Sequence, residues 1–396
     1  MEIIEQLEKM RILQVPFKVL TWSGVWMPED WTQNQRKLKY NLFSFVCIGL
    51  MTIQSCSLTV YLMMSKTWSQ FVETLFLIPP GLSNLQKIFV IMLHRKKVID
   101  LVNMFENGHC IPRTADEWSI QQRYDATIRV VTLVCFVLVN VTMVNMVTTP
   151  LFLKADERIL PMKVWLPYSI ETDFFYWLSY MHQTLGVTLV GSGIIGSTLL
   201  INGFVYQVCC QFEILSSRLE KLPQIIRNLR SLKKSDHLVH QYELKLIKQI
   251  VQHHLYLFSI AETVNEIFKS VIFQQFCVSS IVVSASIFQL STKPDTKTEF
   301  IMVLFYSICL LVELFIYCWF GNKLMFESLN FHQAVYDADW TVLSNESGKD
   351  LMFIMMRASK PIIMYCGHFI VLSLETFLSI LKVSYSVFNV LRRSHG

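Results

Sequence analysis

Charged residues are scarce in this sequence. Only 16% of its 396 residues are Asp, Glu, Lys or Arg, whereas 53% are hydrophobic and the mean hydropathy is +0.40. A soluble globular domain carries about 25% charged residues. The shortage excludes an ordinary water-soluble domain, because most of the surface must face something other than water. The chain is better divided by the roughly 20 apolar residues that one helix needs to cross a bilayer.

Other features are missing as well. The first forty residues contain no apolar run followed by a small-residue cleavage site, so we expect no signal peptide. No Lys–Arg tract of the kind that follows nucleic acid occurs, and the net charge of +5 is mild. His237, His240, His253 and His254 have no cysteine or carboxylate at metal-ligand spacing, and no nucleophile–base pair stands out. We therefore expect no enzyme, no cofactor, no metal site and no nucleic-acid partner.

Seven segments are apolar enough to be membrane spans. They cover residues 40–64, 71–93, 129–154, 174–211, 270–292, 300–322 and 361–391. The second contains Glu73 and Lys87, the sixth contains Glu313, and the seventh contains Glu375 and Lys382. The fourth is much longer than one bilayer, so its helix should tilt or project beyond the lipid.

Lysine and arginine counts predict the orientation of these spans. The amino terminus and the connections after the second, fourth and sixth spans hold 24 of them, against nine on the other side. The sequence therefore predicts an all-α polytopic membrane protein with seven transmembrane helices, a cytosolic amino terminus, an extracellular carboxy terminus and a helical cytosolic extension. The expected regions are 1–39 (cytosolic), 40–206 (spans one to four), 207–268 (cytosolic helices), 269–322 (spans five and six), 323–360 (cytosolic), 361–391 (span seven) and 392–396 (extracellular).

The ten cysteines do not suggest disulfides. None of them lies in a predicted external loop, since seven fall in apolar segments and the others fall in or beside predicted cytosolic loops. We expect free thiols, because the cytosol keeps thiols reduced.

Two internal patterns are interpreted structurally. Residues 191–196 read Gly-Ser-Gly-Ile-Ile-Gly, which matches the dinucleotide-binding fingerprint, but that fingerprint must follow a strand and open a helix. Here it lies within a span, so we interpret the glycines as small residues that allow close helix approach. Residues 211–269 alternate apolar and charged residues at helical spacing, which predicts either one amphipathic hairpin or an assembly domain.

The seventh span is polar along one side. On a wheel of 100° per residue, its polar residues share an arc of about 80°; they are His368, Glu375, Ser379, Lys382, Ser386 and Asn389. Such groups usually face a bundle interior or a water-filled path. The stripe is either a packed seam in which Glu375 and Lys382 shield each other or, as we favour, the wall of a conduit. Val390 lies at the edge of the stripe, where apolar side chains can block ions by dewetting.

The outer halves of spans two, three, four and six are rich in aromatic residues and methionine. A lipid-interface belt explains such residues, and a small apolar ligand would require similar walls. Pattern alone favours the belt. The candidate ligand-binding residues are Phe71, Leu75, Ile78, Met143, Met146, Val147, Phe174, Trp177, Tyr180, Met181, Thr184, Met302, Phe305 and Tyr306.

The last third of the chain resembles insect odorant receptors. Residues 317–324 read Tyr-Cys-Trp-Phe-Gly-Asn-Lys-Leu. Further matching positions are Ser328, Ala334-Val335-Tyr336, Trp340, Arg357-Ala-Ser359-Lys-Pro361, Leu374-Glu375-Thr376-Phe377, Leu381-Lys382, Tyr385-Ser386 and Leu391. The match runs from residue 317 to residue 391, and the chain length, span count and predicted topology agree with it.

The resemblance implies a ligand-gated, non-selective cation channel that needs no G protein. In this family an odour-binding subunit and a common co-receptor form a tetramer, and a small volatile apolar ligand binds among the outer parts of spans two, three, four and six. The family's apolar gate falls at Val390, with Ser386 one turn below, and the outer part of the seventh helix lines the pore. The cytosolic helices join the subunits. The implied location is the plasma membrane of olfactory sensory neuron dendrites.

Two departures separate this chain from related types. Gustatory relatives typically show Thr-Tyr, five residues and then Gln-Phe in the last helix, whereas this chain has Thr376-Phe377 and then Val383-Ser384. The odorant branch is therefore preferred over a gustatory-type channel that forms homo-oligomers. The co-receptor has a longer loop between spans four and five and a small residue near Lys382, so this chain resembles the tuning subunit. Inverted repeats, which a transporter would show, are not seen.

Overall fold

The computed structural model describes residues 11–28, 34–65, 71, 74, 77–106, 108–153, 159–232, 235–291, 297–367 and 369–395. Apart from one 3-10 turn, η2 (Trp340–Val342), and two short strands, β1 (Tyr365–Cys366) and β2 (Ile370–Val371), the elements are α-helices. They are α2 (Arg11–Trp22), α3 (Asn34–Met63), α5 (Ile78–Leu93), α6 (Arg95–Phe105), α7 (Ala115–Leu153), α8 (Asp173–Ser231), α9 (Asp236–Ser291), α10 (Lys297–Asp337), α11 (Asn345–Ala358) and α12 (Leu374–His395). The predicted all-α class is confirmed.

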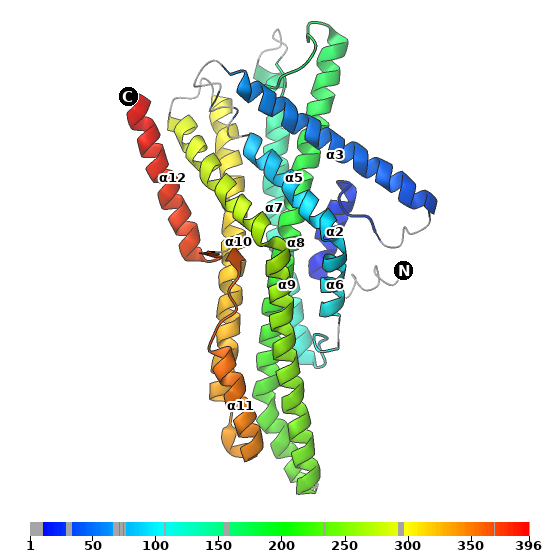
Figure 1. The fold of residues 1–396 in the computed structure, drawn as a ribbon, viewed down its shortest axis with the longest axis vertical. Coiled ribbons are helices and arrows are strands. Elements are labelled where there is room, and N and C mark those ends of the chain that lie inside the picture. The colour runs from blue at the N-terminus through cyan, green and yellow to red at the C-terminus, as the bar shows by residue number, and fades with distance from the viewer. Residues whose placement is uncertain are drawn as a thin grey trace.

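Three very long helices form the axis of the molecule (Figure 1). Helices α8, α9 and α10 contain 59, 56 and 41 residues. At 1.5 Å per residue, the longest would extend roughly 90 Å if straight, about three times the thickness of a bilayer core. They therefore continue well beyond the lipid, as expected for the fourth span. Helices α8 and α9 meet in a hairpin at the lower end of Figure 1, which confirms the predicted helical extension.

Five helices of the described chain are long and apolar enough to cross a membrane. They lie within α3, α7, α8, α9 and α10. The second and seventh predicted spans correspond to α5, which has 16 residues, and α12, which carries Glu375 and Lys382. Neither is among the five helices named above, and the predicted orientation stays a prediction.

The seventh predicted span is shorter than the apolar run suggested. The prediction of a helix from residue 361 is wrong, because residues 361–373 contain the β1–β2 hairpin and α12 begins at Leu374. The strands are antiparallel, with a turn at Gly367, whose φ of 66° favours glycine. The backbone N–H of Gly367 donates to the carbonyl of Lys269 at 2.9 Å, so the segment is fastened to α9. The Ser373 hydroxyl then accepts from Thr376 N at the start of the helix.

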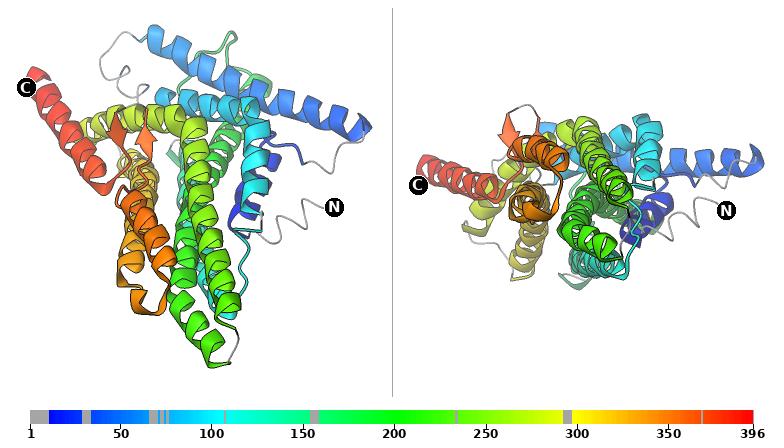
Figure 2. Two further views of the ribbon diagram at one scale, coloured as in Figure 1. Left: turned by 60° about the horizontal axis from the view of Figure 1, so that its bottom comes forward. Right: turned by 90° about the horizontal axis from the view of Figure 1, so that it is seen from below.

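The largest hydrophobic core follows the inner parts of the long helices. It joins α2, α3, α5 and α6 to α7, α8, α9, α10 and α11 and reaches the hairpin before α12. Smaller clusters lie toward the other end, around Met146, Val282 and Phe288. Helix α12 lies at the edge of the bundle in Figure 2, where it packs mainly against α9 and α10.

The glycine pattern at 191–196 is a helix-packing feature. A Cβ on Gly193 would lie 2.7 Å from the Asn84 amide oxygen of α5. A Cβ on Gly196 would lie 2.8 Å from a Leu20 methyl group of α2. The glycines let neighbouring side chains approach the axis of α8 closely, which confirms the interpretation based on small residues.

Candidate functional site

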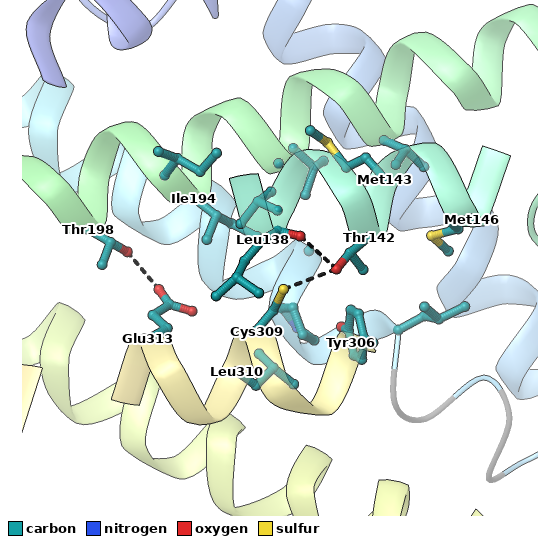
Figure 3. Close-up of a pocket in the computed structure, with 18 of the residues that line it drawn as sticks. Leu138, Thr142, Met143, Met146, Ile194, Thr198, Tyr306, Cys309, Leu310 and Glu313 are labelled. Carbon is teal, nitrogen blue, oxygen red and sulfur yellow. Dashed lines mark hydrogen bonds between the residues drawn. The ribbon is translucent and has the colours of Figure 1, made fainter. Parts of the chain in front are cut away.

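A cavity of about 150 Å³ lies among α3, α5, α7, α8 and α10. An apolar cavity of roughly this size is large enough for a benzene-sized molecule. Its walls are mostly aliphatic and sulfur-containing (Figure 3). They include Leu58, Leu77, Leu138, Val139, Val187, Val190, Ile194, Ile195, Leu310, Met143, Met146, Met162, Cys135 and Cys309. Methionine is flexible and polarisable, so such walls can adapt to ligands of different shapes.

The end of the cavity near Met146 is closed by the segment before α8. Met162 contributes its thioether, and its backbone N–H donates to the Gln183 amide oxygen at 2.8 Å. Nearby, Trp165 N donates to the carbonyl of Ser57 in α3 at 3.2 Å. These bonds hold the segment across the gap between α3 and α8. The lining therefore has a cover whose position is fixed by hydrogen bonds.

Gly191 provides part of the space at this site. A Cβ placed there would lie only 2.3 Å from the Met143 sulfur, so any larger residue would displace that side chain. Both residues line the cavity. The small residue on α8 therefore gives the Met143 thioether room against the helix backbone.

A buried ion pair forms the opposite end of the cavity. Lys87 Nζ of α5 lies 2.6 Å from Glu313 Oε1 of α10, and their side chains are only 2% and 10% exposed. Thr198 Oγ1 of α8 donates to the same oxygen at 2.6 Å, as Figure 3 shows. Gln275 Nε2 of α9 donates to Glu313 Oε2 at 3.0 Å. Because isolated charges are costly in an apolar interior, these donors explain how two embedded charges are accommodated.

Three of the candidate ligand-binding residues line this cavity: Met143, Met146 and Tyr306. Ile78 and Met302 pack in the cluster beside Met146 without lining the cavity. The Tyr180 hydroxyl donates to the backbone carbonyl of Val147. The remaining candidates lie elsewhere. Phe174, Trp177 and Met181 are exposed, as a lipid-interface belt requires. Val147, Thr184 and Phe305 are half-buried and do not line the cavity. Phe71 packs against Phe288 and Phe388, and Leu75 lies outside the described residues.

Most of the lining was missed by sequence reasoning. Leu138, Val190 and Ile194 lie in the middle of spans, where an apolar residue facing a cavity has the same character as one facing lipid. The available signals were Gly191 and the charges Lys87 and Glu313, which mark helix faces turned toward the interior. Gln54, a polar residue inside an otherwise apolar span, is another such signal.

The polar stripe of α12 lies on the surface of the chain. Glu375, Ser379, Lys382, Ser386 and Val390 are exposed and Asn389 is half-buried, while Ser384 and Phe388 are buried on the opposite side. His368 lies outside the described residues. The structure shows no ion pair between Glu375 and Lys382, although both are described, so the packed seam is not formed within one chain. The stripe faces away from the helices of this chain.

Comparison with known proteins gives a consistent result. The sequence profile described as 7tm Odorant receptor matches residues 67–385. Odorant receptor Or1 of Anopheles gambiae is 23% identical over 392 residues, covering 94% of this chain and 93% of the relative. Odorant receptor 46a, isoform A, of Drosophila melanogaster is 25% identical over 328 residues, covering 82% and 83%.

The fold agrees with a solved structure. The olfactory receptor OR5 from Machilis hrabei in complex with eugenol superposes with a TM-score of 0.85 at 16% identity, covering 98% of this chain and all of that chain. A second structure of the same receptor gives the same TM-score of 0.85. Together with a profile that covers most of the sequence, this places the chain in the 7tm odorant receptor family of insects.

Proposed function

We propose that this chain is the odour-binding subunit of a ligand-gated, non-selective cation channel and that it assembles with the odorant receptor co-receptor. The apolar cavity among α3, α5, α7, α8 and α10 carries the proposal. Its Met-rich and aliphatic walls suit a small volatile apolar ligand, and its volume of about 150 Å³ suits a benzene-sized one. The similarity to a receptor whose solved structure contains eugenol supports a ligand of this kind.

The surface position of α12 supports a pore shared between subunits. One chain leaves Glu375, Ser379, Lys382 and Ser386 exposed on a helix at the edge of its bundle. Charged side chains facing lipid are costly, so another subunit or water should cover this stripe. Val390, 66% exposed near the end of α12, would then form the apolar gate with its counterparts in the other subunits.

A path of contacts connects the cavity with this helix. Gln275 joins Glu313 at the cavity to α9, and Ser384 of α12 donates to the carbonyl of Ser280 in α9 at 3.4 Å. Ligand binding that displaces α10 relative to α9 would therefore alter the helix on which α12 packs. We place the assembled channel in the plasma membrane of olfactory neuron dendrites.

Patch-clamp recording of cells that express this chain and the co-receptor tests the proposal. An odorant panel should evoke a conductance only when both are present, and blocking G proteins with a GDP analogue should leave it intact. Val190→Phe, which fills the cavity, should abolish the response, whereas the matched Thr188→Phe on the exposed side of α8 should retain it. Current from this chain alone would favour the gustatory-type channel. A response that requires G-protein signalling would contradict the proposal.

A further inference from the structure

The packing of α12 fixes the side of the helix on which Lys382 lies. Ser384 donates to the carbonyl of Ser280 in α9 at 3.4 Å. The ring of Phe377 lies 5.6 Å from the ring of Phe315 in α10. At 100° per residue, Ser384 is about 160° and Phe377 about 140° around the helix from Lys382. Lys382 is accordingly exposed, on the side of α12 turned away from both neighbouring helices.

Glu375 carries the opposite charge on the same side of α12. It lies about 20° around the helix from Lys382, but seven residues separate the two, or roughly 10 Å along the axis. Both side chains are exposed, and neither forms an ion pair within the part of the chain that the structure describes. Charged groups facing lipid are costly, so this side of α12 requires water. Each charge then acts at its own level of the helix.

Two hydroxyl groups lie on either side of Lys382 along α12. Ser379 Oγ donates to the carbonyl of Glu375 and Ser386 Oγ donates to the carbonyl of Lys382, both at 2.9 Å. Because each hydroxyl proton is used in the helix, the lone pairs of the two oxygens remain available to a cation. The ammonium group of Lys382 is therefore the element between these levels that repels one.

A fixed positive charge acts more strongly on a divalent cation than on a monovalent one. At roughly 6 Å in water, a unit charge repels a monovalent ion by about one RT and a divalent ion by about twice as much. Charged side chains that line a pore set its ion selectivity in this way. One lysine in the path of the ions should lower the permeability ratio of divalent to monovalent cations about threefold.

We infer that Lys382 is a selectivity-determining residue of the channel, whose ammonium group lies in the ion path and reduces the permeation of Ca²⁺ relative to Na⁺. This inference rests on the proposed function, because it requires α12 to line the pore. The odour-binding subunit then affects which ions pass, in addition to binding the odorant.

Reversal potentials of the odour-evoked current test the inference in cells that express this chain with the co-receptor. The most potent compound of an odorant panel on the wild-type pair opens the channel, and external Na⁺ is replaced by Ca²⁺ to obtain the ratio PCa/PNa. Lys382→Gln should raise this ratio about threefold. Lys382→Glu should raise it further, and Lys382→Arg, which keeps the charge, should leave it unchanged. Ratios that do not follow the charge at this position overturn the inference.

Lys39→Gln is the matched control. It removes an exposed positive charge from the start of α3, which lies on the other side of the bundle from α12 in Figure 2. The PCa/PNa ratio of this variant should equal that of wild type. A rise as large as in Lys382→Gln would show that the ratio responds to the net charge of the chain, and it would overturn the inference.

Changing the charge after assembly removes any effect of the substitution on folding. Lys382→Cys channels are opened by the odorant and treated from outside with a positively or a negatively charged methanethiosulfonate. The thiolate of the introduced cysteine forms a mixed disulfide with the reagent and displaces methanesulfinate. The positive reagent should lower PCa/PNa and the negative reagent should raise it, whereas treated wild type, with its ten cysteines, should not change. An unchanged ratio in treated Lys382→Cys overturns the inference.

The inference and the proposed function fail in different ways. If no odorant evokes a conductance from the wild-type pair, the proposed function fails and the inference fails with it. If the conductance is present but PCa/PNa is the same for every charge at position 382, the channel stands and Lys382 lies outside the ion path.

Discussion

The two ends of the helix bundle are packed differently. Toward the end with the α8–α9 hairpin, one continuous core joins residues from nine helices, including the fully buried Phe212, Leu219 and Phe331. At the other end, the buried residues form three small clusters, and the cavity lies beside two of them. A continuous core resists local rearrangement, whereas small separate clusters can shift relative to one another.

This difference suits the proposed channel. In that proposal the hairpin end would provide a rigid frame on which subunits assemble, and the cavity end would provide walls that respond to a ligand. The Lys87–Glu313 pair and its partners lie at the boundary between the two regions, joining α5, α8, α9 and α10. Three predictions address this contrast.

The largest effect is expected at the boundary. Lys87→Met leaves the Glu313 carboxylate buried without its counter-charge, which should cost about 3–5 kcal/mol of stability and remove most receptor from the cell surface. Adding Glu313→Leu should restore much of the loss, since an apolar pair of similar volume carries no charge to desolvate. Surface labelling and thermal unfolding in detergent measure both variants. A stable Lys87→Met protein would show that the pair does not hold the boundary together.

The next largest effect is expected when an apolar side chain is truncated to alanine, and it should differ between the two regions. Leu219→Ala, in the continuous core, should lower the free energy of unfolding by about 2–5 kcal/mol. Met143→Ala, beside the cavity, should cost only about 1 kcal/mol, because that side chain is half-buried and already borders empty space. Thermal unfolding of the purified proteins provides the comparison, and equal losses would contradict a rigid hairpin end and an adaptable cavity end.

The smallest effect concerns acid. Burial, with a smaller contribution from Arg357, lowers the pKa of His254 from 6.5 to about 4. Below about pH 6.5 this histidine is protonated in the unfolded chain but stays neutral in the folded one. The free energy of unfolding is therefore unaffected by this group above pH 6.5 and falls as the pH is lowered toward 4. At pH 5 the loss should be about 2 kcal/mol.

Thermal unfolding between pH 7 and pH 5 tests the acid effect. His254→Leu should reduce the pH dependence, and His253, whose pKa is also lowered by burial and by Arg218, should retain the rest. His237→Leu is the matched control, since that residue is exposed on the same helix. The same pH dependence in wild type and His254→Leu would refute this assignment.

The sequence predicted the fold class better than the site. Composition predicted the long apolar helices, and helical periodicity predicted the helices of the α8–α9 hairpin, because both are local properties. The helix predicted from residue 361 failed, since apolar content cannot distinguish a span from a buried hairpin. Gly321 of α10 makes room for the end of that hairpin. A Cβ on Gly321 would lie only 2.6 Å from the backbone oxygen of Leu372.

The candidate site was only partly found, for a related reason. Hydropathy places a residue in the membrane but does not say whether it faces lipid or cavity. Phe174, Trp177 and Met181 look as suitable as Met143 and Met146 in the sequence, yet the first three are exposed.

The sequence by itself determined an all-α membrane protein and the polar stripe of α12, because each follows from residues near one another in the chain. The tertiary structure decided the cavity and its ion pair. Lys87 and Glu313 are 226 positions apart, and only the packing of α5 and α10 against α8 and α9 brings them together. That packing depends on shape and on paired charges across helices, and those are not readable from composition or periodicity.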